Sequence, residues 1–122
     1  MPVRSLNSSV LVWPGRGEVD RAVRAWAARV AKAHPELIRL GYFGSYSRGD
    51  WGVGSDLDLV AIVSAADETW DRRTLSWDLQ GLPVPADLLV YTQAEWDRLM
   101  RIPGRFAREL LRTVAWVFPA ME

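Results

Sequence analysis

The sequence predicts an α/β (α+β) domain in which helices pack against a mixed β-sheet. Three short segments, 38–43, 57–63 and 84–91, have the apolar and β-branched composition of buried strands. Segments with the apolar period of a helix lie before the first strand and after the third. Glycine or proline stands between most of these segments, as is typical of turns that connect elements.

Composition indicates a single domain over residues 1–122. With 122 residues, of which 49% are hydrophobic, the chain can bury about two-thirds of its unfolded surface, but it has no room for a second catalytic domain. Fifteen Lys and Arg residues balance fifteen Asp and Glu residues, so a broad basic surface for nucleic acid is not expected. The chain has no cysteine, which excludes disulfides and thiolate metal sites.

The sequence carries no signal for export or membrane insertion. No basic and apolar leader opens the chain, and no apolar run reaches the roughly 20 residues that a membrane helix needs. We therefore expect a soluble, cytoplasmic protein.

The N-terminal part is expected to form an arm and then a helix. Residues 8–13 are β-prone and stop at Pro14, so residues 1–17 are interpreted as an N-terminal arm or edge strand. A helix over 18–33 follows, because apolar residues recur there at helical spacing. It ends before Pro35, since proline disfavours helical geometry in the residue that precedes it.

Helices are expected between and after the later strands. Thr92 and Glu95 match a capping box, which predicts the start of a helix directly after the third strand. Apolar spacing in the last helix would turn Phe106 and Leu110 inward. The expected elements are helices over 67–77, from 92 to about 102 and over 105–112, and a closing strand over 114–118.

One glycine-rich turn has the features of a phosphate site. Gly44 allows strained backbone and lets a ligand approach the main chain closely. If Ser45 begins a short helix after the first strand, the free amides of its first turn point at whatever lies above Gly44. Ser45 adds a hydroxyl donor, and Arg48 adds a planar, charged fork that suits phosphate oxygens. These residues predict a cradle for a phosphate group.

Two aspartates stand at the head of the second strand. Because side chains two residues apart lie on one face of a strand, Asp56 and Asp58 project together while Leu57 turns to the other face. Mg²⁺ prefers hard oxygen ligands of this kind, joined by substrate phosphates. An isolated Asp-x-Asp is more often a cap or a solvated turn, but its place after the glycine-rich turn favours a metal site.

Two better-known motifs do not fit the same residues. The spacing of Gly44 and Gly49 matches half of a P-loop, but the two residues after Gly49 are not the required Lys and Ser or Thr. A calcium loop that began at Asp56 would need an oxygen ligand where Val60 stands and glycine where Ala61 stands. Both readings fail.

The pattern resembles the GS-x10-DxD signature of the polymerase-β-like nucleotidyltransferases. Gly44-Ser45 is followed, after ten residues, by Asp56-Leu57-Asp58, and the flanking residues resemble the small minimal nucleotidyltransferase branch. In that family a later strand supplies a third carboxylate, and Asp87 stands at the matching place. The resemblance covers roughly residues 38–91 and implies the polymerase-β-like nucleotidyltransferase fold.

A site built from these residues constrains the sheet. Ser45 at the end of the first strand must meet Asp56 and Asp58 at the start of the second, so these strands are expected to run antiparallel. Asp87, near the start of the third strand, can reach the same place only if strands two and three are parallel. The segment 67–77 would then form their crossover, which is expected to be right-handed.

The resemblance implies nucleotidyl transfer, in which an acceptor hydroxyl attacks the α-phosphate of ATP or another nucleoside triphosphate and pyrophosphate leaves. The catalytic residues, which would also hold two Mg²⁺ ions, are expected to be Asp56, Asp58 and Asp87. The nucleotide-binding residues are expected to be Gly44, Ser45 and Arg48.

The acceptor is expected on another subunit, because the chain has no room for an acceptor-binding domain. The resemblance implies a HEPN-type protein partner in a toxin–antitoxin pair, to which AMP is transferred; a homo-oligomer is the other expected assembly. Two alternatives stay open. One is a non-catalytic antitoxin module that binds nucleotide or partner, and the other is a small-molecule nucleotidyltransferase of the antibiotic-modifying type.

Overall fold

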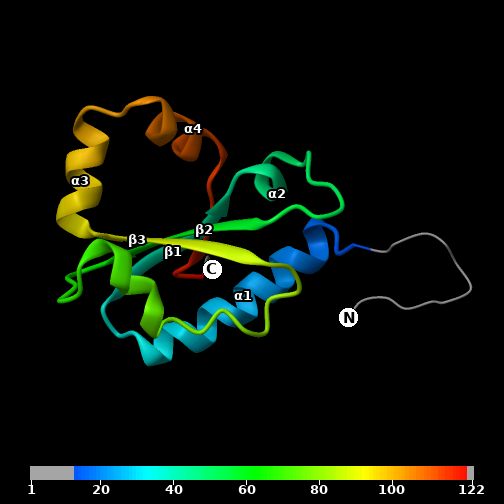
Figure 1. The fold of residues 1–122 in the computed structure, drawn as a ribbon, viewed down its shortest axis with the longest axis horizontal. Coiled ribbons are helices and arrows are strands. Elements are labelled where there is room, and N and C mark those ends of the chain that lie inside the picture. The colour runs from blue at the N-terminus through cyan, green and yellow to red at the C-terminus, as the bar shows by residue number, and fades with distance from the viewer. Residues whose placement is uncertain (1–12, 121–122) are drawn as a thin grey trace, which may run out of the picture.

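The structure, a computed structural model, describes residues 13–120 and has a four-stranded mixed sheet at its centre (Figure 1). The strand order is β3-β2-β1-β4. Strand β1 runs antiparallel to both β2 and β4, whereas β2 and β3 run parallel. The predicted mixed sheet is therefore confirmed, with both predicted strand pairings. The strands are β1 (Leu37–Phe43), β2 (Leu57–Val63), β3 (Ala86–Thr92) and β4 (Ala115–Phe118).

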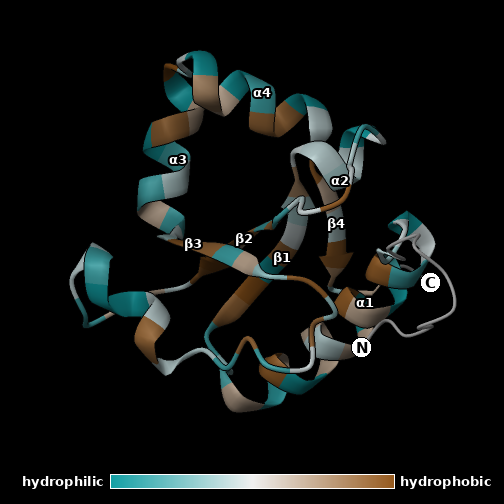
Figure 2. Cartoon of the chain, turned by 45° about the vertical axis from the view of Figure 1, so that its right-hand side comes forward, coloured by the Kyte–Doolittle hydropathy of each residue, from teal (hydrophilic) through white to brown (hydrophobic). Residues whose placement is uncertain are grey.

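Helices cover the sheet on both faces (Figure 2). The longest, α1, lies on one face, while α3 and α4 lie on the other and α2 follows β1 directly. None of the helices in residues 13–120 is long and apolar enough to cross a membrane. The helices are α1 (Arg16–Ala33), α2 (Ser45–Arg48), the 3₁₀ helix η1 (Trp70–Ser76), α3 (Gln93–Arg101) and α4 (Arg105–Thr113).

The face under α1 holds the larger apolar core. Trp26 of α1 has no exposed surface and packs with the odd-numbered residues of β2, such as Leu57 and Leu59, which are also fully buried. Its indole Nε1 donates a hydrogen bond of 2.6 Å to the carbonyl of Asp78, so the polar atom of this buried ring has a partner. The helical spacing of the apolar residues in 18–33 predicted this buried stripe, and the structure confirms it.

The opposite face is built from the even-numbered residues of β2. Val60 and Ile62 are buried there with Trp96 of α3 and Leu110 of α4. The predicted capping box begins α3: the Thr92 hydroxyl accepts from the amide of Glu95, and the Glu95 carboxylate accepts from the amide of Thr92.

Two expected elements differ from the structure. The helix expected over 67–77 is a 3₁₀ helix, Trp70–Ser76, that begins three residues later. Its apolar stripe is too thin for an α-helix, since Trp70 is 46% and Leu75 72% exposed, and the buried residue is Arg73. Two guanidinium nitrogens of Arg73 donate to the carboxylate of Glu95, at 2.6 and 3.0 Å, and Nη1 also donates to the carbonyl of Val90 at 3.1 Å.

The first helix also begins earlier than expected. Helix α1 begins at Arg16, so the last two residues of the range 1–17 belong to the helix. The β-prone segment 8–13 falls, except for its last residue, outside the described residues.

The expectation for Phe106 is wrong. Phe106 and Leu110 were both expected to turn inward, but Phe106 is 50% exposed, while Leu110, one turn later, is fully buried.

Candidate active site

Asp58 lies at the centre of the predicted site because of the sheet register. Its Cα is paired with that of Phe43 on β1 and with that of Asp87 on β3. Asp58 and Asp87 therefore lie side by side on neighbouring parallel strands, on the face that α3 and α4 cover. Asp56 precedes β2 by one residue. The structure thus brings together all three of the predicted carboxylates near the start of β2 and β3.

The three carboxylates differ in burial and in charge environment. Asp58 is half-buried, whereas Asp56 and Asp87 are exposed. Burial raises the pKa of Asp58 above its ordinary value, and the negative charges of Asp87 and Asp56 raise it further, while Arg48 opposes the shift. The site concentrates negative charge, which a divalent cation would relieve.

The donor chemistry of this trio fits Mg²⁺, since all three side chains offer hard carboxylate oxygens. In the described part of the chain, however, no group of three or more acidic, histidine or cysteine side chains is arranged so that it could hold a metal ion. Asp56 and Asp87 are close enough to raise the pKa of Asp58, but the three carboxylates are not arranged around one metal position.

Gly44 joins the predicted cradle to Asp58. Its backbone has φ 81° and ψ −149°, a conformation that favours glycine. A Cβ at this position would overlap Oδ2 of Asp58, so the main chain and the carboxylate can approach only because the side chain is missing. The end of β1 and the head of β2 are therefore in direct contact, as the predicted site requires.

The short helix α2 confirms the predicted turn after β1. The amide of Arg48 donates to the Gly44 carbonyl at 2.9 Å, and Gly49 ends the helix in the left-handed conformation with φ 90°. Tyr46 anchors this helix: it has no exposed surface, its hydroxyl donates to the Pro14 carbonyl at 3.2 Å, and its ring stacks on Trp51 at 5.7 Å. The buried Tyr46 side chain therefore fixes the position of the first-turn amides of α2.

Arg48 lies at the outer side of the cradle and is engaged in ion pairs. Its Nε donates to Asp50 at 3.0 Å and its Nη1 donates to Glu109 of α4 at 3.4 Å. The guanidinium has 36% of its side-chain surface exposed and lowers the pKa of Asp58, so it is near the carboxylates. A phosphate on the cradle would have to compete with these two carboxylates for Arg48.

Helix α4 supports the cradle through its last turn. The hydroxyl of Ser47 donates to the carbonyl of Thr113, and the amide of Gly44 donates to the Thr113 hydroxyl at 3.5 Å. The Thr113 hydroxyl itself donates to the Glu109 carbonyl at 3.0 Å, which fixes its orientation. Sequence reasoning missed Thr113 and Glu109, because no local pattern connects them with a turn more than 60 residues earlier.

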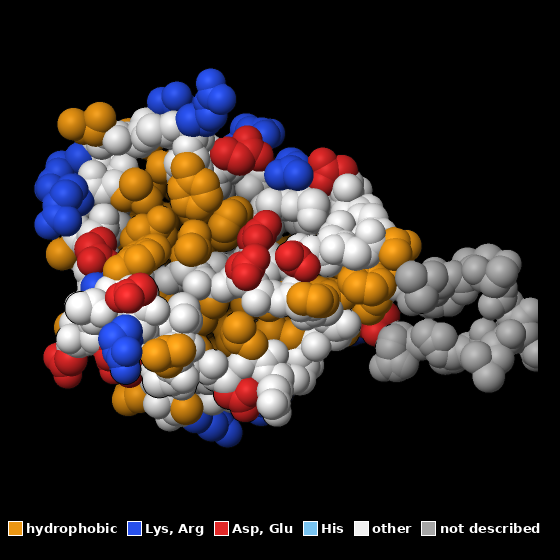
Figure 3. Space-filling model, viewed as in Figure 1, with side chains coloured by type: hydrophobic (Ala, Val, Ile, Leu, Met, Phe, Trp, Pro, Cys, Tyr) orange, Lys and Arg blue, Asp and Glu red, His pale blue; other side chains and the backbone are white. Residues whose placement is uncertain are grey.

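A hollow of about 620 Å³ opens directly beside the carboxylates. In Figure 3 it appears as a group of hydrophobic side chains between the helices α3 and α4 and the sheet, next to a group of acidic side chains. Its apolar lining and its acidic end make it suited to a molecule that presents a polar atom from an apolar body. Six of the residues that line this hollow are Phe43, Asp58, Leu79, Asp87, Leu89 and Phe106.

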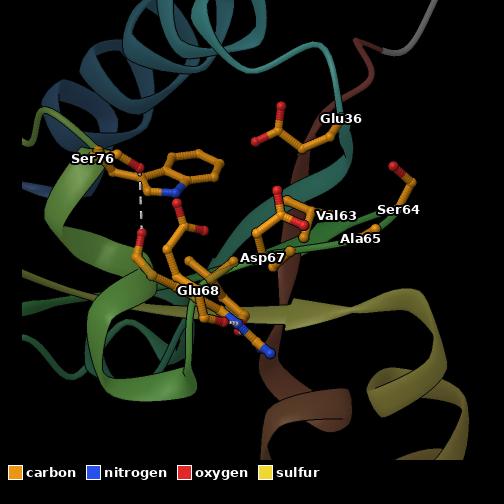
Figure 4. Close-up of a pocket in the computed structure, with 11 residues that line it drawn as sticks. Glu36, Val63, Ser64, Ala65, Asp67, Glu68 and Ser76 are labelled. Atoms are coloured by element: carbon orange, nitrogen blue, oxygen red, sulfur yellow. Dashed lines mark hydrogen bonds between the residues drawn. The ribbon is translucent and has the colours of Figure 1, made fainter.

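A second cavity, of about 350 Å³, lies at the other end of β2 (Figure 4). Glu36, Asp67 and Glu68 line it together with the buried Arg73. Two hydrogen bonds to the Glu95 carboxylate hold Arg73 there, so the buried guanidinium has a structural partner. None of the six predicted site residues lines this cavity.

Comparison with known proteins identifies the family. The family described as nucleotidyltransferase domain matches residues 24–108, which is more than half of the chain. No curated protein matches the chain significantly.

Solved structures with similar folds agree. A Sulfolobus solfataricus protein assigned as a nucleotidyltransferase has a TM-score of 0.56 at 23% identity, over 68% of this chain and 75% of its own. A toxin–antitoxin structure with AMP-PNP has a TM-score of 0.56 at 18% identity. A mutant of the toxin–antitoxin pair MntA–HpeT has a TM-score of 0.54 at 15% identity. Each of the last two covers 81% of this chain and 74% of its own.

The neighbours establish the polymerase-β-like fold, and the family match extends over the cradle, all three carboxylates and most of the helices. The chain belongs to the nucleotidyltransferase domain family and is a transferase enzyme.

Proposed function

We propose that this protein transfers a nucleoside monophosphate, AMP from ATP, to a hydroxyl on an acceptor protein. The observation that supports this most directly is the contact of Gly44 with Asp58, which itself is in register with Asp87. A turn suited to a triphosphate thus lies beside paired carboxylates suited to a divalent cation that the reacting phosphate would share.

The proposed roles follow from the position of each side chain. Gly44 and Ser45 would hold phosphate oxygens through main-chain amides and a hydroxyl, so that the α-phosphate is oriented for in-line attack. Arg48 would exchange its carboxylate partners for a phosphate oxygen, because both of its ion pairs are exposed to solvent and cost little to break.

The carboxylates would act on the acceptor. The acceptor oxygen forms a bond to the α-phosphorus, the bond from that phosphorus to the bridging oxygen breaks, and pyrophosphate leaves with the electron pair. Asp87 is exposed and lines the hollow, so it could accept the hydroxyl proton. Mg²⁺, when bound, would be held by Asp56, Asp58 and Asp87 and would stabilise the charge that develops on the phosphate oxygens.

Two observations on other proteins favour a protein acceptor and an adenine nucleotide. Two of the similar structures are toxin–antitoxin pairs, and one of them is a complex with the ATP analogue AMP-PNP. In the other, two aspartates that are separated by one residue are changed to glutamate. Asp56 and Asp58 of this chain have the same spacing. These neighbours support a protein partner in a toxin–antitoxin pair, and the family resemblance leads us to propose that this partner is of the HEPN type.

The decisive experiment is transfer from α-labelled ATP in the presence of Mg²⁺ to the product of the adjacent gene, read by intact mass for an added nucleotidyl group. Asp58→Asn should lower transfer at least about 100-fold while ATP binding persists, because a proposed ligand of the Mg²⁺ that stabilises charge on the reacting phosphate is lost. Asp67→Asn, an exposed aspartate at the other end of β2, is the matched control and should change little.

Removal of divalent metal with EDTA should stop transfer, and Mg²⁺ should restore it. Undiminished transfer by Asp58→Asn would refute the mechanism. ATP binding by the wild-type protein without any transfer would instead favour the alternative of a non-catalytic antitoxin module.

A further inference from the structure

The hairpin of α3 and α4 leaves large apolar side chains uncovered. Phe106, at the start of α4, is 50% exposed, and Ile102, between the two helices, is 87% exposed. On the face under α1, by contrast, the large apolar side chains of the helix are buried. Figure 3 shows a group of hydrophobic side chains beneath α3 and α4, and Phe106 lines the hollow there. Exposed apolar surface of this kind, in a hollow, marks a site of interaction.

The uncovered surface is continuous with the candidate active site. Phe106 contacts Phe43 edge-to-face, with ring centroids 5.9 Å apart, and both rings line the hollow of about 620 Å³. Asp58 and Asp87 line the same hollow. A chain segment that fills it would therefore bring its polar groups next to the two carboxylates.

The hairpin is basic although the whole chain has no net charge. Its arginines are all exposed, and Figure 3 shows Lys and Arg side chains along the outer edge of the helices, beyond the hydrophobic ones. Residues 93–113 contain three acidic residues, of which Glu95 is bound to Arg73 and Glu109 to Arg48 and Arg112. The five arginines of the hairpin are Arg98, Arg101, Arg105, Arg108 and Arg112.

We propose that the hollow and its arginine rim are the docking surface for a segment of a partner polypeptide that is apolar at its centre and acidic at its flanks. The apolar centre would pack on Phe106 and Leu89, and the acidic flanks would lie along the arginines of α3 and α4. That this segment also carries the acceptor hydroxyl rests on the function proposed above; the docking itself does not.

Charge argues against the two other occupants. A second copy of this chain, docked through the same surface in a symmetric dimer, would bring the arginine rim against itself. A nucleic acid would have to lay its phosphates along an apolar floor that ends at Asp58 and Asp87. A polypeptide with acidic flanks would place negative charge beside the arginine rim and apolar side chains on the apolar floor of the hollow.

The proposal is tested by selecting a displayed library of random short peptides on the full-length protein. Enriched peptides should share an apolar core with Asp or Glu on its flanks. A fluorescein-labelled peptide of the enriched sequence then serves as the probe for binding by anisotropy. No enrichment, or enrichment of basic peptides, would overturn the proposal.

Two matched pairs of variants locate the binding surface. Phe106→Gln should weaken binding of the probe peptide at least about tenfold, as loss of a central aromatic contact does. Leu111→Gln should change the affinity less than about twofold. Leu111 is 45% exposed on the same helix, but it lies about 140° around the helix axis from Phe106. Substitution of both Arg101 and Arg105 by Glu should weaken binding of the probe peptide at least about fivefold and make the binding less dependent on salt.

The charge control reverses two exposed basic residues of α1, Arg21 and Lys32, and should leave the affinity unchanged. Equal effects of both members of either pair would overturn the proposal. A labelled single-stranded RNA that binds the wild type and is lost in Phe106→Gln would assign the surface to nucleic acid instead. Asp56→Asn, at a proposed Mg²⁺ ligand that is not among the residues lining the hollow, should lose transfer but keep peptide binding, so that loss of docking and loss of catalysis are distinguishable.

Discussion

The two faces of the sheet are built from the same strands but do different work. Under α1, Trp26 and the odd-numbered residues of β2 form a closed apolar layer. Under α3 and α4, the even-numbered residues begin with Asp58, continue through Val60 and Ile62, and meet helices that leave Phe106 exposed. Alternation along one strand therefore places the larger apolar core on one face and the candidate site on the other.

This division explains how a small domain can hold repelling carboxylates. Placing Asp58 in the sheet costs free energy, as its raised pKa indicates, because burial and neighbouring negative charge both disfavour its ionised form. The closed face provides the burial that offsets such a cost, so a change there should reduce stability. A change at an exposed residue of the open face, such as Phe106, should mainly alter function.

The largest effect on stability is expected from Trp26→Ala. The substitution removes a fully buried indole and its hydrogen bond to the Asp78 carbonyl, which should lower the free energy of unfolding by about 3–5 kcal/mol. Urea denaturation followed by circular dichroism would measure it. Trp70→Ala, at a ring 46% exposed, should cost about 1 kcal/mol or less. Equal losses in the two variants would show that the faces are not divided as described.

Gly44→Ala should be next in size, and its effect should fall on activity. The new methyl group would overlap Oδ2 of Asp58, and the backbone at φ 81° is strained for alanine. Displacement of Asp58 from the cradle should lower transfer by about 100-fold, the cost of a misplacement of roughly 1 Å. Gly52→Ala is the control, since a Cβ there meets nothing within 4 Å. Full activity of Gly44→Ala would mean that the contact with Asp58 is not required.

Much of this architecture could be predicted from local sequence. The strands, the turn after β1 and the capping box of α3 depend on residues close together in the chain, so spacing and residue type were sufficient. The pairing of strands followed from one requirement, that Ser45 and Asp87 both reach the head of β2.

What could not be predicted depends on contacts between distant segments. Arg73 appeared to belong to a weak amphipathic helix, but its burial is fixed by Glu95. Phe106 and Leu110 have the same helical spacing and the same apolar character, yet the hollow exposes the first and the sheet buries the second. The support of Ser47 by Thr113 has no signal in either local sequence. The roles assigned to the three aspartates stay predictions for experiment.

A smaller effect, dependent on pH, is expected at the ion pair that fixes α3. Hydrogen bonds from Arg73 lower the pKa of Glu95 from 4.5 to about 2. Because the folded-state value is lowered, the carboxylate stabilises the protein above pH 4.5, and this contribution is lost as pH falls through about 2. Glu95→Gln should cost about 1–2 kcal/mol at neutral pH, after allowance for solvent screening of a side chain one-third exposed.

The measurement is the difference in unfolding free energy between wild type and Glu95→Gln as a function of pH. It should be constant above about pH 5 and shrink below the ordinary glutamate pKa of 4.5. Thr92→Ala, which removes the cap hydroxyl but keeps the carboxylate and its bonds to Arg73, should cost about 1 kcal/mol and follow this titration only weakly, because Arg73 is the largest cause of the lowered pKa of Glu95. A constant difference for Glu95→Gln down to pH 3 would contradict the assigned pairing.

The smallest effect on stability is expected from Phe106→Ala, on the open face itself. Phe106 is half exposed and its main contact is the ring of Phe43, so truncation should lower the unfolding free energy by no more than about 1 kcal/mol. Leu110→Ala, one turn further along α4, removes a side chain with no exposed surface and should cost about 2–5 kcal/mol. A large loss for Phe106→Ala in the same urea titration would make this ring part of the core, and the hollow would then have to be explained without a partner.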